Sequence, residues 1–136
     1  MYLPPTAVTN LLKTLSTSFP KSRIVIYDAI VKDDIFGNVM CKNLENAGVN
    51  TEGLRAVSSL KDQENRVRDC GFNFSVRSCT MLQVYDNLLS GEQRRKANRI
   101  EMLDEMEEWN LIMGHYCFVV GDNFEEEGST CSSSGD

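Results

Sequence analysis

The order of the predicted elements places this 136-residue chain in the α/β class, with an incomplete layered sheet. Amphipathic helical segments alternate with three short strand-like runs. The first run, residues 23–30, is continuously apolar over Ile24-Val25-Ile26, which is typical of a strand buried on both faces inside a parallel sheet. So few strands would leave an edge and a face uncovered, so we expect a sheet that is cut through its core.

The N-terminal segment predicts the end of a strand followed by a helix. Tyr2 and Leu3 read as the last residues of the strand. Pro4-Pro5 opens the helix, because the fixed φ of proline suits the first helical turn, and Pro20 ends it. The helix carries one apolar stripe, formed by Val8, Leu11, Leu12, Leu15 and Phe19.

Two capping signals define the helices in the middle of the chain. Asp34 is a good N-cap, since its short carboxylate can accept a backbone hydrogen bond. Ser59 and Asp62 form the capping-box pattern of a second helix, which Gly71 ends. Between the two helices, residues 49–58 read as a loop.

The rest of the chain predicts an edge strand, two helices and a final strand. Residues 72–77 alternate apolar and polar positions, which indicates a half-exposed strand near a sheet edge. Thr80 caps a short helix that breaks at Gly91. A long acidic helix then runs to Gly114, and residues 115–120 follow as a buried strand.

The long helix is expected to bury one face and to expose the other. At helical spacing the apolar face consists of Met102, Met106, Trp109 and Met113. The acidic face consists of Glu101, Asp104, Glu105 and Glu108. We expect the first set to be the more buried, and we interpret the acidic set as a solvated face rather than a metal site.

Composition argues against several classes of function. The net charge of −6 gives no broad basic surface for nucleic acid. Five cysteines without C-x-x-C spacing, and a single histidine, indicate reduced thiols in the cytosol or nucleus and no zinc site. No apolar run approaches membrane-spanning length. Residues 122–136, rich in Glu, Ser and Gly, predict a disordered acidic tail.

The most specific motif lies near the C-terminus. Residues 99–109 read R-I-E-M-L-D-E-M-E-E-W, and residues 115–117 read H-Y-C. This order resembles the end of the leucine carboxyl methyltransferase family, where an R-I-E-x-L-D-E-x-E-E-W run leads into a terminal H-Y-C strand.

Other segments support the resemblance in the same order. Residues 23–28 are similar to the family's fifth strand, and Gln63 and Arg66 match its S-L-x-x-Q-x-x-R helix. The similarity covers residues 1–121, which it identifies as the C-terminal half of a methyltransferase domain. It implies the C-terminal portion of a Rossmann-like class I S-adenosylmethionine-dependent methyltransferase, beginning inside the fourth strand.

The resemblance also implies an activity. Its cofactor would be S-adenosylmethionine, and its partner the C-terminal tail of the protein phosphatase 2A catalytic subunit, whose terminal leucine carboxylate is methyl-esterified. A terminal carboxylate has a pKa of ~3.5, so it is already ionised and can attack a sulfonium methyl group without a catalytic base. The enzyme then needs to position the reactants and exclude water. A cytoplasmic location, with the nucleus as a second one, and a monomeric whole protein are expected.

Topology supplies the candidate site residues. Ligands of open α/β sheets bind outside the carboxyl ends of the strands, where Tyr27 and Asp28 lie. His115 and Tyr116 reach the same edge if the last strand runs antiparallel, as in the family. We therefore predict that these four bind substrate and that Tyr2 binds cofactor, and we assign no catalytic residue. The simpler alternative is that His115 and Tyr116 satisfy a helix end and fill the core.

Two other functions remain open. The related tRNA wybutosine-synthesis methyltransferase shares the domain but usually continues into a kelch-type propeller. The acidic tail soon after the final strand, and the negative charge, favour the protein-modifying enzyme. A non-catalytic truncated product with only an interaction role is the third candidate.

The sequence predicts that this chain is truncated and does not act alone. It lacks a glycine-rich strand-to-helix turn and an acidic residue after a second strand, the features with which such folds hold an adenosyl cofactor. We expect no measurable binding of S-adenosylmethionine in a calorimetric titration of the isolated chain. Micromolar binding would contradict this expectation.

Overall fold

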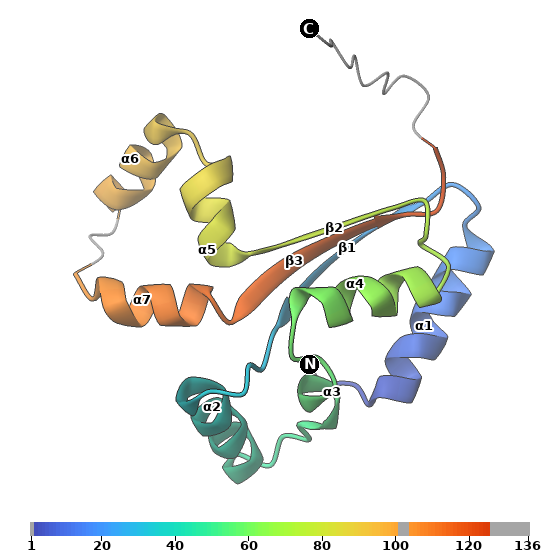
Figure 1. Ribbon diagram of the computed structural model, residues 1–136, viewed down its shortest axis with the longest axis horizontal. Coiled ribbons are helices and arrows are strands. Elements are labelled where there is room, and N and C mark those ends of the chain that lie inside the picture. Colours follow the sequence, from blue (N-terminus) through green and yellow to red (C-terminus); the bar gives the residue numbers. More distant parts are fainter. Residues whose placement is uncertain (1, 101–103, 126–136) are drawn as a thin grey trace, which may run out of the picture.

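A three-stranded antiparallel sheet organises the molecule (Figure 1). The computed structural model describes residues 2–100 and 104–125. Strand β3 (Tyr116–Asp122) lies between β1 (Arg23–Ala29) and β2 (Ser75–Thr80) and is antiparallel to both. The predicted mixture of helix and sheet, and the antiparallel last strand beside residues 23–30, are confirmed.

The helices gather around one face and both ends of this sheet. They are α1 (Pro5–Ser18), α2 (Ile35–Asn46), α3 (Glu52–Arg55), α4 (Leu60–Asp69), α5 (Met81–Gln83) with its π-helical continuation η1 (Val84–Leu88), α6 (Gly91–Ile100) and α7 (Met106–Met113). Figure 1 shows α4 along the sheet with α1 beside it, and α5, α6 and α7 together beyond the start of β3.

The predicted helix caps are confirmed. The Asp34 carboxylate accepts a hydrogen bond from the backbone N–H of Gly37 at 2.8 Å. The Ser59 hydroxyl accepts one from the N–H of Asp62 at 3.1 Å, and Thr80 heads a complete capping box. These caps depend on residues three apart, which is why local sequence defines them.

One face of the sheet packs against α1 and α4. The buried cluster there combines Ile30, Val67, Phe72, Cys117 and Val119. Burial raises the pKa of the Cys117 thiol to about 11, so this cysteine stays a neutral packing group. The hydroxyl of Ser16 donates to the Cys70 carbonyl at 2.6 Å and thereby joins α1 to the end of α4.

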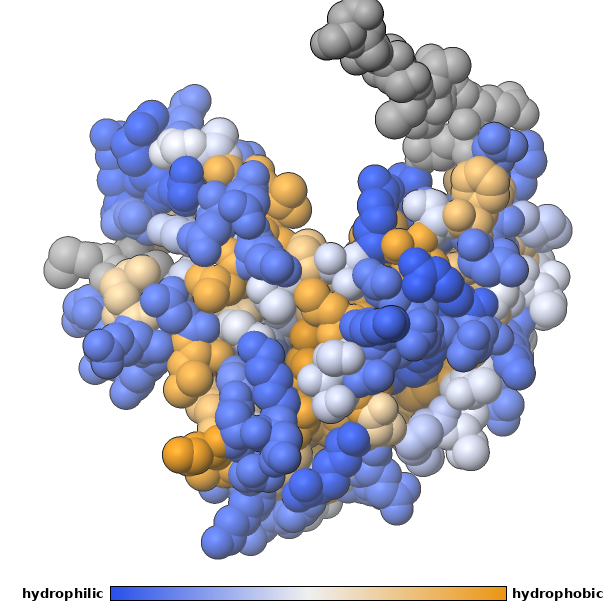
Figure 2. Space-filling model, in the orientation of Figure 1, coloured by the Kyte–Doolittle hydropathy of each residue, from blue (hydrophilic) through white to orange (hydrophobic). Residues whose placement is uncertain are grey.

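The other face of β1 is open, contrary to the prediction that residues 23–30 are buried on both faces. Val25 and Tyr27 are 59% and 53% exposed, and β1 is an edge strand. Among the described residues, only the end of this face, at Ala29, is covered, where it packs with Cys41 of α2 and Leu54 of α3. Tyr2 and Leu3, predicted as a strand end, lie outside the described strands. Figure 2 shows apolar side chains in the middle of the face in view, surrounded by hydrophilic ones.

The long acidic helix is interrupted, which corrects the prediction of a continuous helix. Helix α6 ends at Ile100, and Asp104 and Glu105 are not helical. Trp109 and Met113 are half-buried, and Trp109 packs edge-on against the Tyr85 ring at 4.6 Å, but Met106 is 42% exposed. Glu101 and Met102 lie outside the described residues.

Three boundaries also differ from the predictions. The expected loop 49–58 contains the single helical turn α3, and β2 begins three residues later than the alternating run 72–77 suggests. Asp122, assigned to the tail 122–136, is buried in β3, and the Asn123 amide donates to the Phe19 carbonyl at 2.8 Å. The remainder of the predicted tail, residues 126–136, lies outside the described residues.

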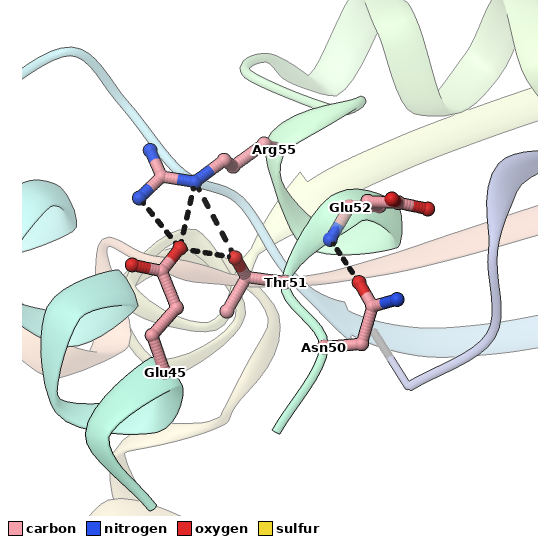
Figure 3. A network of polar contacts seen from close by, with 5 residues as sticks. All are labelled: Glu45, Asn50, Thr51, Glu52 and Arg55. Carbon is pink, nitrogen blue, oxygen red and sulfur yellow. Dashed lines mark hydrogen bonds and ion pairs between the residues drawn. The ribbon is translucent and has the colours of Figure 1, made fainter. Parts of the chain in front are cut away.

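A polar network joins α2 to α3 (Figure 3). The Arg55 guanidinium donates to the Glu45 carboxylate from Nε at 3.1 Å and from Nη2 at 2.9 Å, and the Thr51 hydroxyl donates to the same carboxylate. Donation by Thr51, and then by Arg55, lowers the pKa of Glu45. Asn50 accepts from the N–H of Glu52 and so starts the α3 turn. The segment expected to be a loop is therefore held in place by hydrogen bonds between α2 and α3.

The close approach of α4 to β3 requires glycine at position 121. A Cβ added there would lie 2.5 Å from Val67 Cγ1 and 3.0 Å from Phe72 Cβ. We predict that Gly121→Ala lowers the free energy of unfolding by about 1–3 kcal/mol through overpacking. In chemical denaturation the double variant Gly121→Ala/Val67→Ala should lose less stability than the sum of the two single variants, because Val67→Ala removes the clashing methyl groups. Additive effects of the two substitutions would contradict this contact.

Candidate functional site

A cavity of about 490 Å³ brings four of the five predicted site residues together. Tyr2, Tyr27, Asp28 and Tyr116 all line it, despite their separation in sequence. The apolar wall is formed mainly by α1 and β1, through Val8, Leu11, Leu12, Leu15, Ile24 and Ile26. Juxtaposition of these four is confirmed, whereas their roles in binding substrate or cofactor stay predictions.

A buried polar cluster lies at this cavity. Arg66 of α4 lines the cavity with Asp28, and its Nη2 lies 3.4 Å from Asp28 Oδ2. The side chains of Asp28 and Arg66 are 11% and 15% exposed. The same Nη2 donates to Gln63 Oε1, and Gln63 is fully buried. Asp28 Oδ1 accepts from the N–H of Ala29 at 3.0 Å.

The cluster has more donors than acceptors. Arg66 Nε and Gln63 Nε2 are buried and have no hydrogen-bond partner among the described residues. A buried donor left unpaired costs about 1–3 kcal/mol. Sequence reasoning placed Gln63 and Arg66 in a helix motif but did not assign them to a site. A polar pair at i and i+3 on the buried side of an amphipathic helix is the signal that could have found them.

Three aromatic side chains line up on the open face beside the cavity. The rings of Tyr27 and Tyr116 stack at 5.5 Å with an interplanar angle of 17°, and Tyr27 is 5.2 Å from the ring of Phe118. Burial raises the pKa of Tyr27, with smaller contributions from Tyr116 and Cys117. Tyr27 therefore stays a neutral phenol with an accessible hydroxyl, suited to hydrogen bonding rather than to general-base work.

His115 does not line the cavity, and the structure gives it the alternative role of satisfying a helix end. It is 2% exposed, and its Nδ1 lies 2.7 Å from the Leu111 carbonyl in α7. Its Nε2 lies 3.0 Å from Asp34 Oδ2. Both ring nitrogens therefore lie within hydrogen-bond distance of an acceptor. His115 joins the end of α7 to the start of α2.

The glycines with positive φ lie at helix ends in the described part of the chain. Gly48 and Gly71, the described glycines with positive φ, follow α2 and α4 instead of turning out of a strand. Within residues 2–100 and 104–125, no three His, Cys, Asp or Glu side chains converge as metal ligands. Over the same residues, no helix has the length and hydropathy to cross a membrane.

Comparison with known proteins identifies the class. Over 128 residues the chain is 32% identical to leucine carboxyl methyltransferase 1 of Emericella nidulans, a match that covers 89% of this chain and 34% of that protein. It is 34% identical over 119 residues to the protein of that name in Caenorhabditis elegans, covering 88% and 35%. The Bos taurus protein is 32% identical over 117 residues, covering 86% and 35%. No family model matches.

These relatives make the chain a homologue of carboxyl methyltransferases, a class compatible with its α/β fold and its cavity. More narrowly, it belongs to the leucine carboxyl methyltransferase family, as the motifs indicated. The chain spans about a third of the length of the curated relatives it matches.

The Asp34–His115 pair predicts acid sensitivity. Donation by the Gly37 N–H, followed by His115, lowers the pKa of Asp34 in the folded chain. The unfolded chain therefore takes up the proton first, so the stabilisation is complete above the ordinary Asp pKa of ~3.9 and is lost as pH falls through the lowered value. We expect Asp34→Asn to flatten the fall in unfolding midpoint below pH ~4. The exposed neighbour Asp33 gives the control Asp33→Asn, and equal slopes for the two variants would contradict the prediction.

Proposed function

We propose that this chain forms the methyl-acceptor part of an S-adenosylmethionine-dependent enzyme that esterifies the C-terminal leucine carboxylate of the protein phosphatase 2A catalytic subunit. The observation that carries the proposal is the match, over nearly nine-tenths of the chain, to proteins named leucine carboxyl methyltransferase 1. The cavity supports it, because its apolar wall suits the aliphatic side chain of a leucine.

The methyl transfer needs no catalytic base from the protein. The acceptor carboxylate is ionised at neutral pH, and S-adenosylmethionine would supply the methyl group. The remaining requirement is to bind the acceptor in one orientation and to keep water away. The helix α1 and the strand β1 supply an apolar wall for this purpose, and the Tyr27–Tyr116 stack fixes the position of both rings beside it.

The partner follows from the substrate. The phosphatase tail is a polypeptide end, which a cavity of about 490 Å³ can receive without a large interface. We propose a cytoplasmic location, with the nucleus as a second one, where such a tail and reduced thiols coexist. The five cysteines fit this, since Cys41, Cys70 and Cys117 are buried and free.

Two alternatives remain distinct proposals. A tRNA wybutosine-synthesis methyltransferase would need surfaces for phosphate, which a net charge of −6 does not favour in this chain. A non-catalytic product would use only a binding surface. The relatives named above carry the leucine-modifying name, which favours the first function.

A chimaera tests the proposal. Residues 2–125 would replace the matching segment of the Bos taurus relative, and transfer of labelled methyl groups would be measured with a peptide that ends in free leucine. We predict base-labile methyl ester on this peptide and none on its leucinamide analogue, which has no carboxylate to attack. The same relative without the segment is the negative control.

The outcomes separate the three functions. Ester formation on the free-leucine peptide alone supports the proposal. Transfer to tRNA instead would support the second function. A folded chimaera that methylates neither acceptor, while retaining binding to the phosphatase, would contradict the proposal in favour of an interaction role.

A further inference from the structure

Helix α6 contributes little to the core of the molecule. None of its residues is buried, and Ile100 at its end is 80% exposed. Two side-chain hydrogen bonds connect it to η1: Arg94 Nη1 donates to the Asp86 carbonyl at 3.4 Å, and the Tyr85 hydroxyl donates to Asn98 Oδ1 at 3.3 Å. A short helix that is polar on all sides gains little from packing. The composition of α6 therefore needs a reason other than the core.

Positive charge is concentrated on this helix. Arg94, Arg95, Lys96 and Arg99 are four of the 14 lysines and arginines in the chain, and Glu92 is the single acid of α6. None of the four cations forms an ion pair with a carboxylate of the described residues. Like charges three or four positions apart on a helix repel each other. An external anion would relieve this repulsion.

One side of α6 carries three of these cations around a hollow. Arg95, Lys96 and Arg99, together with Glu92, line a surface hollow of about 500 Å³. Their i, i+3, i+4, i+7 spacing places them on one helix face, about 10 Å long at 1.5 Å per residue. All four side chains are exposed. We call this surface the basic face of α6, and Figure 1 shows α6 on the opposite side of the molecule from α1 and its cavity.

The charge of the surrounding chain limits the length of an anion on the basic face. A polyanion much longer than about 10 Å would extend off the face and onto a chain whose net charge is −6. Exposed acidic side chains, those of Asp104, Glu105, Glu107 and Glu108, lie around the start of α7 in the same group of helices. Carboxylates repel an anion within the Debye length of about 8 Å. The face therefore suits a short anionic segment.

The mixture of donors and acceptor favours a polypeptide over a phosphodiester chain. The cations of the basic face only donate hydrogen bonds, and the Glu92 carboxylate only accepts them. An acidic polypeptide offers carboxylates to the cations and backbone N–H groups to Glu92. A phosphodiester backbone offers acceptors alone, so it would place a like charge against Glu92. The guanidinium forks of Arg95 and Arg99 also match carboxylates in bidentate geometry.

We propose that the basic face of α6 is a docking site for an acidic segment of a partner protein, whose Asp or Glu side chains pair with Arg95, Lys96 and Arg99. The proposal goes beyond methyl transfer and is independent of it, because the basic face shares no residue with the cavity at β1. Each exposed pair contributes modestly. The affinity therefore comes from three pairs acting together, and it falls as salt is added.

Two labelled peptides test the proposal on the 136-residue chain. One consists of four Glu-Gly repeats, and the other consists of four Gln-Gly repeats and has the same length without charge. In fluorescence anisotropy at low ionic strength we expect the acidic peptide to bind about tenfold more tightly, since three exposed pairs together supply about one decade of affinity. Raising the salt concentration to about 0.5 M should remove this preference.

Two matched triple variants locate the binding. Glutamine in place of the three cations of the basic face preserves good helix formers and should remove the preference for the acidic peptide. The control places glutamine at Lys13, Lys42 and Lys61, which are exposed on α1, α2 and α4, so the net charge changes equally. This control should keep the preference. Circular dichroism would confirm that both variants retain the helical content of the parent chain.

Several results would overturn the proposal. They are equal affinity for the two peptides, a preference that survives neutralisation of the basic face, and an equal loss in the control, which would indicate attraction to net charge alone. Tighter binding of a 12-nucleotide single-stranded DNA, lost with the basic face, would replace the acidic segment by nucleic acid. If the triple variant fails to fold, Arg95→Gln takes its place, and the preference should fall roughly twofold. An unchanged preference in Arg95→Gln would also contradict the proposal.

Discussion

The pairing of β3 with two strands that do not touch each other is the constraint on which the other elements depend. β1 and β2 have no described partner in the sheet except β3. Cys117 and Val119 of β3 are fully buried beneath α4, and Gly121 leaves the space that Val67 occupies. Because the register also fixes Tyr116 opposite Ala29, it determines which side chains meet at the cavity.

Two buried polar groups near this sheet differ in whether all their hydrogen-bonding atoms have partners. At His115 both ring nitrogens lie beside acceptors from the protein, the Leu111 carbonyl and the Asp34 carboxylate. The side chain therefore has a partner for each nitrogen and joins α7 to α2. At Arg66 and Gln63, one buried side-chain donor of each residue, Arg66 Nε and Gln63 Nε2, has no partner among the described residues. A satisfied buried group specifies a structure, whereas an unsatisfied buried donor lowers its stability.

The helix caps could be predicted from the sequence, but the solvent exposure of each strand face in the folded chain could not. Asp34, Ser59 and Thr80 cap helices as expected, because a cap involves residues three apart. The apolar run at residues 24–26 correctly indicated a strand, but no local pattern reveals that one of its faces is uncovered. The Asp28–Arg66 contact joins positions 38 residues apart, so the sequence around either residue does not predict it. The family motif, in contrast, was sufficient to place the chain among its relatives.

The position of β3 at the end of the described chain has a consequence for the timing of folding. Arg23 and Asp122 are paired although they lie 99 residues apart. A ribosome adds about 5–20 residues per second, so β1 emerges roughly 5–20 s before its partner. During that interval its Ile-Val-Ile run and its backbone edges have no native strand to join. Loop closure over such a span is also slow compared with forming the helices. The nascent chain therefore exposes this apolar strand for several seconds. During that time, contact with other chains competes with the native pairing of β1 with β3.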